Sequence, residues 1–401
     1  MRDKVVVAFA VNKEFVPYCF VAIFSLIDHI ESVREYEIII LETELSEEDI
    51  ELLGSLSNDK VIVRCINISE YIRNIVFEES IHLSVETYYR LFIPAVLSQY
   101  ERVLYLDSDL CVLRDVAELF DEDIEGYPVG AIQDVHSKNI RNHSIDIGNL
   151  DYHYVFNAGV LLINTKEFEK QNIRNRCLEE LRKDYAKKNR KLVFADQDAL
   201  NIVLYRNFRE LEKKWNCQWF YTWRPEALDD DYRERYFNDL NNAYIIHYSG
   251  DIKPWKHPDK EKAELFWKYA AKTSVFQRIL VDNMIALRDR GDSNKCFEKY
   301  RFPYDQIPYG SKVVLYGAGE VGRSFYEQNL LTKYVRYVLW VDRDFKIKSE
   351  DMPVRSIEDI RETEYDYILI AINRESVALN AIHVLKKMDV QSESIVWQRY
   401  H

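Results

Sequence analysis

Two acids one residue apart, Asp107 and Asp109, follow an apolar run at residues 102–106. In extended backbone, residues i and i+2 point to the same side, so both carboxylates can face one point in space. Two such acids repel each other and lose hydration unless a positive group lies between them. Their oxygens suit magnesium or manganese, and such an ion commonly carries a diphosphate. The simpler alternative for this triplet is a solvated turn at the end of a strand.

A histidine ends another apolar run much later in the chain, at His247. Its imidazole could complete a metal site with the two acids, because neutral histidine is a common ligand. Gly250 would let a phosphate approach the backbone closely, and Lys253 would supply a positive charge. Taken singly, His247 is typical of a core histidine. Taken together with the acids, it is predicted to bind the metal.

Amide and carboxylate groups mark two further segments. Asn157 lies at the start of an apolar strand pattern, and its amide offers donors and an acceptor suited to sugar hydroxyls. Asp196 and Gln197 begin a helical pattern. For Asp196 alone the alternative is a helix N-cap, because short acidic side chains often cap helices.

Strand and helix patterns alternate over residues 1–120, which predicts an α/β fold with a mostly parallel sheet covered by helices. The expected strands are 5–11, 37–41, 61–68 and 103–106, and the expected helices include 46–56 and 84–93, the latter stopping at Pro94. Ligands of such sheets bind outside the carboxyl ends of the strands. The acidic pair lies at one of those ends.

The later part of the first domain is expected to contain strands at 155–163 and 243–248 and helices at 167–187, 196–205 and 260–288. The predicted domains are therefore residues 1–290 and residues 310–401. A segment with turn residues and two prolines, 291–309, is predicted to link them.

The second domain opens with a strand pattern that runs directly into Gly317, Gly319 and Gly322, and the next strand ends at Asp342. This context is typical of a dinucleotide-binding turn, with phosphate at a helix N-terminus and the acid on a ribose. The segment is short for a complete dinucleotide domain. A Rossmann-like packing or interaction module that keeps the turn is the alternative to a bound nucleotide.

Composition limits the classes of protein to consider. The 401 residues, 47% hydrophobic and 30% charged, provide material for two cores, and the net charge of −13 argues against a nucleic-acid binder. Six scattered cysteines without a C-x-x-C pair indicate reduced thiols in a cytosolic protein. The start of the chain leads directly into a strand rather than a signal peptide. No apolar run approaches the roughly 20 residues that span a bilayer.

Residues 172–192 carry a dense run of lysines and arginines. A solvated helix face is one interpretation of this run. A peripheral contact with anionic lipid, or with a charged acceptor, is the other.

Five motifs together resemble glycosyltransferase family 8, which includes glycogenin and bacterial lipopolysaccharide galactosyl- and glucosyltransferases. The motifs are the segments 107–109, 156–159, 196–198, 215–216 and 247–255. They occur in the order found in that family, and the resemblance covers roughly residues 1–285. The resemblance implies a GT-A fold, a UDP-glucose or UDP-galactose donor, manganese, and retention of anomeric configuration.

The same resemblance implies roles for individual residues, by position. The implied metal ligands are Asp107, Asp109 and His247; the implied contacts to the donor nucleotide are Ala10, Asn12, Arg90, Ser108, Gly250 and Lys253; and the implied sugar site is Asn157, Asp196 and Gln197. Asn12 stands where related sequences often carry Asp, although an amide can still pair with a uracil imide.

The sequence therefore predicts a retaining, metal-dependent enzyme that moves glucose or galactose from a UDP-sugar to a saccharide or glycolipid acceptor. The expected location is the cytoplasm, including the inner face of the membrane. No side chain is obviously placed as a nucleophile, so same-face attack by the acceptor is favoured over a covalent intermediate on Asp196. Two other classes stay open: a non-catalytic nucleotide-sugar-binding or scaffolding protein, and an NAD-linked oxidoreductase centred on the second domain.

Overall fold

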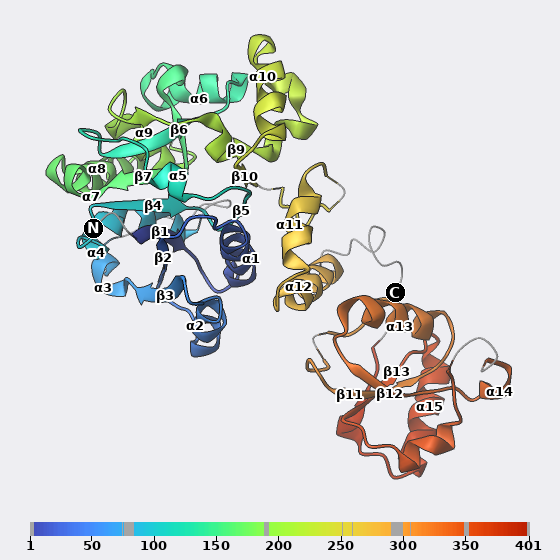
Figure 1. Cartoon of the computed structure of the whole chain (residues 1–401). Helices are drawn as coiled ribbons and strands as arrows, with labels where there is room; N and C mark the ends of the chain where they lie inside the picture. The colour runs from blue at the N-terminus through green and yellow to red at the C-terminus, as the bar shows by residue number, and fades with distance from the viewer. Residues whose placement is uncertain are drawn as a thin grey trace. The chain divides into compact units, whose positions relative to one another are not determined.

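The computed structural model describes residues 4–73, 75, 84–187, 192–250, 252–258, 260–289, 300–304, 306–348 and 353–398. The chain divides into two compact units, Met1–Val275 and Phe276–His401. Their elements are labelled in Figure 1.

A seven-stranded sheet forms the centre of the first unit, in the order β3-β2-β1-β4-β7-β6-β8 (Figure 1). The strands are β1 (Lys4–Ala10), β2 (Glu35–Glu42), β3 (Val61–Asn67), β4 (Arg102–Leu106), β6 (Val129–Gln133), β7 (Phe156–Asn164) and β8 (Arg209–Glu210). β1, β2, β3 and β4 run parallel, whereas β7 is antiparallel to both β4 and β6. The predicted α/β fold with a mostly parallel sheet is confirmed.

The strands and helices follow from their residues. After Lys4, β1 is a continuous apolar run that is buried throughout, as expected for a parallel strand covered on both faces. α2 (Glu47–Gly54) begins after Ser46, whose side chain accepts a hydrogen bond from the Asp49 N–H. Three acids in its first turn favour the positive end of the helix dipole.

A small second sheet has the order β5-β10-β9, and its middle strand carries His247. Its strands are β5 (Leu110–Val112), β10 (Ile245–His247) and β9 (Cys217–Gln218). β10 is antiparallel to β5, and His247 is paired with Leu110. Because Asp109 directly precedes Leu110, this register holds the imidazole beside the acidic pair.

The other helices of the first unit lie in the connections between the strands. They are α1 (Val16–Ile27), α3 (Ser69–Ile72), η1 (Val85–Phe92), α4 (Ile93–Val96), α5 (Ala117–Phe120), α6 (Lys138–Gly148), η2 (Tyr152–Tyr154), α7 (Thr165–Lys170), α8 (Ile173–Tyr185), α9 (Ala195–Val203), η3 (Lys213–Asn216), η4 (Trp219–Trp223), η5 (Pro225–Ala227), α10 (Asp230–Asn241) and α11 (Ala263–Ala270).

Three helix predictions differ from the structure. The predicted helix 260–288 is divided into α11 (Ala263–Ala270) and α12 (Phe276–Asp289), which belong to different units. The segment predicted as one helix ending at Pro94 is the 3-10 helix η1, and Pro94 instead lies in the first turn of α4, where a missing N–H costs no intrahelical hydrogen bond. The predicted helix 167–187 is divided between α7 and α8. Asn172 separates them with a φ of +53°, which ends the first helix.

The second unit is built on a parallel sheet in the order β12-β11-β13-β14. Its elements are α12 (Phe276–Asp289), β11 (Lys312–Tyr316), α13 (Glu320–Thr332), β12 (Arg336–Val341), α14 (Phe345–Lys348), η6 (Ile357–Glu362), β13 (Tyr367–Ile370), α15 (Glu375–Lys387), η7 (Ser392–Ser394) and β14 (Ile395–Val396). This arrangement confirms the predicted Rossmann-like α/β fold of the second domain.

The division between the units falls earlier than the predicted boundary. α12 was expected to close the first domain, but Val281 on this helix is buried in the core of the second unit. Tyr300 and Phe302, in the predicted linker 291–309, are buried in the same core. Residues 290–299 lie outside the described residues. Within the predicted linker, the described residues 300–304 therefore belong to a packed segment of the second unit.

Among the described residues, no helix combines the length and the apolar character needed to cross a bilayer. The cysteines of the described ranges are free thiols. Cys296 and residues 188–191 of the basic run lie outside those ranges.

Candidate metal centre

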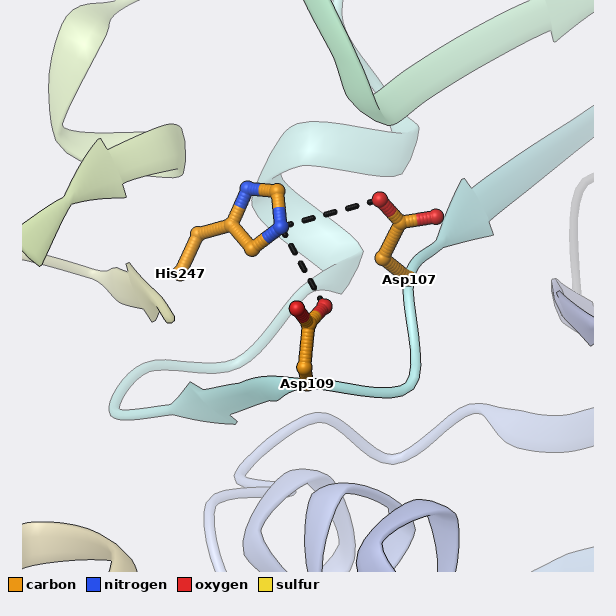
Figure 2. Close-up of side chains that lie close together, drawn as sticks. All are labelled: Asp107, Asp109 and His247. Carbon is orange, nitrogen blue, oxygen red and sulfur yellow. Dashed lines mark ion pairs between the residues drawn. The ribbon is translucent and has the colours of Figure 1, made fainter. Parts of the chain in front are cut away.

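Asp107, Asp109 and His247 point toward one another in Figure 2. His247 Nε2 lies 3.6 Å from Asp107 Oδ2 and 3.2 Å from Asp109 Oδ1. One ligand atom from each residue lies within 4.8 Å of the other two. The acids flank the turn between β4 and β5, and the histidine ends β10. The structure thus brings together the three predicted ligands from distant parts of the sequence.

Each carboxylate gives one oxygen to a positive side chain and turns the other toward the histidine. Asp107 Oδ1 lies 3.1 Å from Arg90 Nη2, and Asp109 Oδ2 lies 2.5 Å from Lys253 Nζ. The other two oxygens, Asp107 Oδ2 and Asp109 Oδ1, face His247. They form a donor set of two oxygens and one nitrogen, which suits a hard or borderline divalent cation.

Gly159 provides the space in which this cluster forms. A Cβ at this position would lie 2.2 Å from His247 Cε1 and 2.7 Å from Asp107 Oδ2. The φ of Gly159 is not positive, so its backbone does not itself require glycine. The missing side chain therefore serves the close approach of the imidazole and the carboxylate. This cradle and the donor set together fit a divalent cation.

Backbone groups fix the orientation of two amides next to the cluster. Gln197 Oε1 accepts from the Ala158 N–H at 2.9 Å and from Asn157 Nδ2 at 3.1 Å. Its Nε2 lies 3.4 Å from Oδ2 of the buried Asp134. Asn157 Oδ1 accepts from the Gly159 N–H at 3.0 Å. Because a backbone N–H can only donate, these contacts determine which end of each amide is the oxygen.

The chain of hydrogen bonds continues through Asn216 to His247. Asn216 Nδ2 donates to Asn157 Oδ1 at 2.9 Å, so its own oxygen faces the other way, 2.9 Å from His247 Nδ1. In the neutral imidazole, Nδ1 therefore carries the hydrogen. Nε2 is left with a lone pair directed at the two carboxylates. This is the tautomer that a metal-binding histidine needs.

Arg90, on η1, connects the acidic pair to the predicted sugar site. Its guanidinium is buried, with Nη2 near Asp107 and Nε 2.9 Å from Asp196 Oδ2. The Tyr105 ring lies 4.7 Å from Arg90 Cζ, and its hydroxyl donates to Asp107 Oδ1 at 2.6 Å. Thr87 Oγ1 donates to Asp196 Oδ1 at 2.8 Å. Asp196 thus pairs with η1 and does not cap α9, whose N-cap is another residue, so the helix-cap alternative is wrong.

The carboxyl groups of Asp196 and Asp109 have pKa values shifted in opposite directions. Burial raises the pKa of Asp196 to about 6, and the neighbouring Arg90 offsets only part of this effect. Burial acts in the same direction on Asp109, but Lys253 and His247 outweigh it and hold the pKa of Asp109 well below its usual range. Asp109 is therefore ionised throughout the physiological range, as a metal ligand must be.

The predicted nucleotide contacts lie around the end of β1. Ser108 Oγ donates to Ala10 O at 2.8 Å, so this hydroxyl holds the acidic turn against β1. Asn12 Oδ1 accepts from the Phe15 N–H at 3.0 Å, and its Nδ2 donates to Glu86 Oε2 at 3.1 Å. The Asn12 side chain thus shapes the turn that leads into α1.

The loop after β10 carries the predicted diphosphate contacts. Gly250 has a φ of +86°, a conformation that favours glycine. Lys253 Nζ donates to Tyr248 O at 2.9 Å in addition to its ion pair with Asp109. Asp251, between them in the sequence, lies outside the described residues. The remaining predicted contacts, Gly317, Gly319, Gly322 and Asp342, belong to the second unit.

Two residues that order this site, Tyr105 and Asp134, were not among the predicted site residues. Tyr105 could have been found, because it precedes Asp107 by two positions in a strand and so lies on the same side. Asp134 follows β6 directly, just as Asp107 follows β4. Asn216 belongs to the motif 215–216, but its role in orienting His247 has no local indication, since its partners come from two distant strands.

Three comparisons relate the chain to known proteins. It matches the family described as Glycosyl transferase family 8 over residues 6–258. General stress protein A of Bacillus subtilis is 32% identical over 212 residues, which cover 49% of this chain and 70% of that protein. Lipopolysaccharide 1,2-glucosyltransferase of Escherichia coli is 31% identical over 175 residues, which cover 43% of this chain and 50% of that protein.

Among solved structures, the galactosyltransferase LgtC in complex with donor and acceptor sugar analogues is similar to this chain, with a TM-score of 0.55 and 24% identity. The match covers 67% of this chain and 96% of LgtC. At this level of identity the likeness concerns the fold, and it confirms the predicted GT-A fold.

Proposed function

The chain belongs to glycosyltransferase family 8, and from this membership we propose that it transfers glucose or galactose from a UDP-sugar to a saccharide or glycolipid acceptor. The observation that carries the proposal is the cluster of Asp107, Asp109 and His247, with one oxygen of each acid and the lone pair of Nε2 facing a common point. The named glucosyltransferase and galactosyltransferase among the similar proteins support a hexose donor.

Asp107, Asp109 and His247 would hold manganese or magnesium. When bound, the ion supplies positive charge that stabilises the negative charge developing on the departing diphosphate. Lys253 stands beside Asp109 and adds a second positive charge in the same place. The backbone of Gly250, in a turn whose positive φ favours glycine, would contact a phosphate. Removing one such electrostatic contact commonly costs about 10²–10³ in rate.

The rest of the donor would lie between the end of β1 and the start of α9. Ala10 and Asn12 would border the uracil and ribose, near Ser108. Gln197 would face the hexose, and Asn157 would hold the Gln197 amide in place through its hydrogen bond at 3.1 Å. Arg90 would set the position of this sugar site relative to the metal site.

For the chemical step we propose attack by the acceptor hydroxyl on the face from which UDP departs, with a phosphate oxygen taking the proton. The new glycosidic bond then has the configuration of the donor bond. A covalent glycosyl-enzyme on Asp196 is disfavoured by its surroundings. This carboxylate is only 1% exposed, lies 2.9 Å from Arg90 Nε, and accepts a hydrogen bond from Thr87.

We propose that the protein is cytoplasmic, because its buried cysteines, such as Cys19 and Cys111, are free thiols and thiols stay reduced in the cytoplasm. A basic anchor to lipid receives less support. Lys183 Nζ lies 2.9 Å from carboxylate oxygens of both Glu179 and Glu180, so acids of the same helix neutralise part of the basic run. This pairing favours a solvated helix face for α8.

A donor screen tests the proposed function. The full-length protein is incubated with manganese and each common nucleotide sugar, and released UDP or GDP is measured. We expect UDP release from UDP-glucose or UDP-galactose, and a loss of about 10²–10³ or more in Asp109→Ala, which should still unfold cooperatively. Asp230→Ala is the matched control, because the Asp230 side chain is 95% exposed.

Other outcomes would contradict the proposal. Full activity in Asp109→Ala would show that Asp109 is not part of a metal site that the reaction needs. Binding of UDP without release from any nucleotide sugar favours the non-catalytic alternative. An absorbance change that requires NAD favours the oxidoreductase.

A further inference from the structure

A cavity of about 320 Å³ opens in the second unit, where β11, β12 and β13 end. Its walls come from Gly317 and Gly319 after β11, from Asp342 after β12, from Asn373 after β13, and from one side of α15. In the sheet order β12-β11-β13-β14, the chain passes from one side of β11 to the other between β12 and β13. The cavity therefore lies at the switch point where parallel α/β sheets bind their ligands.

Protein packing explains two of the three glycines of this turn. Gly317 has a φ of +112°, and its Cβ would lie 2.8 Å from Ala371 O. A Cβ on Gly322 would lie 2.0 Å from Gly317 O, so this glycine lets α13 approach the strand. Gly319 differs, because its φ is −87° and a Cβ there would meet no atom within 4 Å. A side chain at position 319 would therefore extend into open space at the cavity rather than into the protein.

The groups around the opening suit different parts of a nucleotide. Gly319 is the N-cap of α13 and offers no side-chain cap, so the first N–H groups of the helix are available to a phosphate. Asp342 accepts from the N–H groups of Ala318 at 2.7 Å and Asp344 at 2.8 Å, which hold its carboxylate in place. Asp342 lines the cavity, and a carboxylate there suits the hydroxyls of a ribose.

The opposite wall is apolar and suits a flat ring. It is formed by Ile357, Ile372, Val377, Ala381 and Val384. The lining of the cavity contains three acidic residues and one basic residue, namely Glu320, Asp342, Asp344 and Arg343. A ligand with several phosphates would therefore meet a net negative charge. The volume lies near the lower end of the roughly 300–1,000 Å³ of small-molecule sites. One nucleotide fits these limits better than a whole dinucleotide.

We propose that this cavity binds a ribonucleotide, with its phosphate at Gly319, its ribose at Asp342 and its base against α15. The ribonucleotide is either free or one half of a dinucleotide such as NAD. All the lining residues of this cavity belong to the second unit, and none of them is a predicted metal ligand. Because of the acidic lining, affinity should not rise as phosphates are added to the nucleotide.

Calorimetry of the full-length protein tests the proposal. Asp109→Ala in EDTA is used as the background, so that metal-dependent donor binding does not contribute. AMP, UMP and NAD are titrated in turn, together with ATP and 2′-deoxy-AMP. We expect at least one of AMP and UMP to bind, ATP to bind no more tightly than AMP, and 2′-deoxy-AMP to bind at least several-fold more weakly. Binding of NAD as tightly as AMP assigns the ligand to a dinucleotide, and binding of AMP or UMP alone assigns it to a free nucleotide.

Two pairs of variants tie the binding to the cavity. Gly319→Leu should weaken binding at least tenfold by filling the opening, whereas Gly54→Leu, also in open space and with no positive φ, should not. Val377→Arg should weaken binding, and Leu379→Arg, on the same helix but 52% exposed and outside the lining, should not. No heat with any nucleotide, or unchanged affinity in folded Gly319→Leu, would overturn the proposal.

Discussion

Asn216 sets the tautomer of His247 without itself being a proposed ligand. Asn216→Ala removes the acceptor that faces Nδ1, so the hydrogen can move to Nε2 and block the lone pair. We expect manganese affinity to fall by about 10–100-fold, the usual effect of losing a partner behind a metal-binding histidine. Electron paramagnetic resonance of added Mn²⁺ measures it. Asn242→Ala, at an exposed amide bonded to Asn238, is the control. Unchanged affinity in a folded Asn216→Ala protein would contradict this role.

Asp196 gives the protein a pH-dependent stability that can be measured. Burial raises its pKa from 3.8 to about 6 in the folded state. Between about pH 4 and pH 6 the folded state keeps a proton that the unfolded state has lost, so the free energy of unfolding falls as pH rises. Above about pH 6 both states are ionised and the fall is complete.

In Asp196→Asn this titration is absent. We expect the free energy of unfolding of the variant, relative to the wild type, to rise between about pH 4 and pH 6 and then level off. Urea unfolding across this range measures the difference. A constant difference at all these pH values would show that Asp196 has an ordinary pKa.

At the scale of elements, the first turn of α9 holds a strained residue next to the site. Ala195 has a φ of +42°. Left-handed backbone costs an L-residue about 1–2 kcal/mol, and glycine avoids this at a smaller entropic cost. Ala195→Gly should therefore raise the free energy of unfolding by about 0.5–1 kcal/mol. Ala199→Gly, inside the same helix, should lower it by about 1 kcal/mol. Equal effects in urea unfolding would show that no strain is stored at Ala195.

The predicted elements were most accurate where local residues decide them. The strand Lys312–Tyr316 ends directly before Gly317, as predicted, because its short apolar run meets a glycine whose φ of +112° is not that of a strand. η1 was mistaken for an α-helix, since the same apolar spacing serves both kinds of helix over so short a segment. β5 and β9 were not predicted, because strands of two or three residues carry no pattern and depend on pairing with β10.

The same distinction applies to the candidate site. Asp107 and Asp109 could be grouped by their spacing in extended backbone. Their approach to His247 depends on the antiparallel pairing of β10 with β5, which no local pattern encodes. The chemical type of the histidine and the family resemblance suggested His247, and the tautomer followed only from the tertiary contacts of Asn216.

At the scale of the whole molecule, the division after Val275 assigns α12 to the second unit. A fragment of residues 1–275 should keep the donor site and remain monodisperse. A fragment of residues 1–290 would expose Val281 and Met284, which are buried in the core of the second unit, and should aggregate more readily. Size-exclusion chromatography and UDP release compare the two. Less aggregation and more UDP release by the fragment 1–290 than by the fragment 1–275 would show that α12 belongs with the first unit.

One titration tests most directly whether a single cation links these acids and this imidazole to the donor. UDP is titrated into the full-length protein with and without Mn²⁺, in the wild type and in His247→Ala. We expect manganese to raise the affinity for UDP at least tenfold in the wild type and to have no effect in the variant. Equal affinity for UDP with and without manganese, or an undiminished effect of manganese in His247→Ala, would contradict the account.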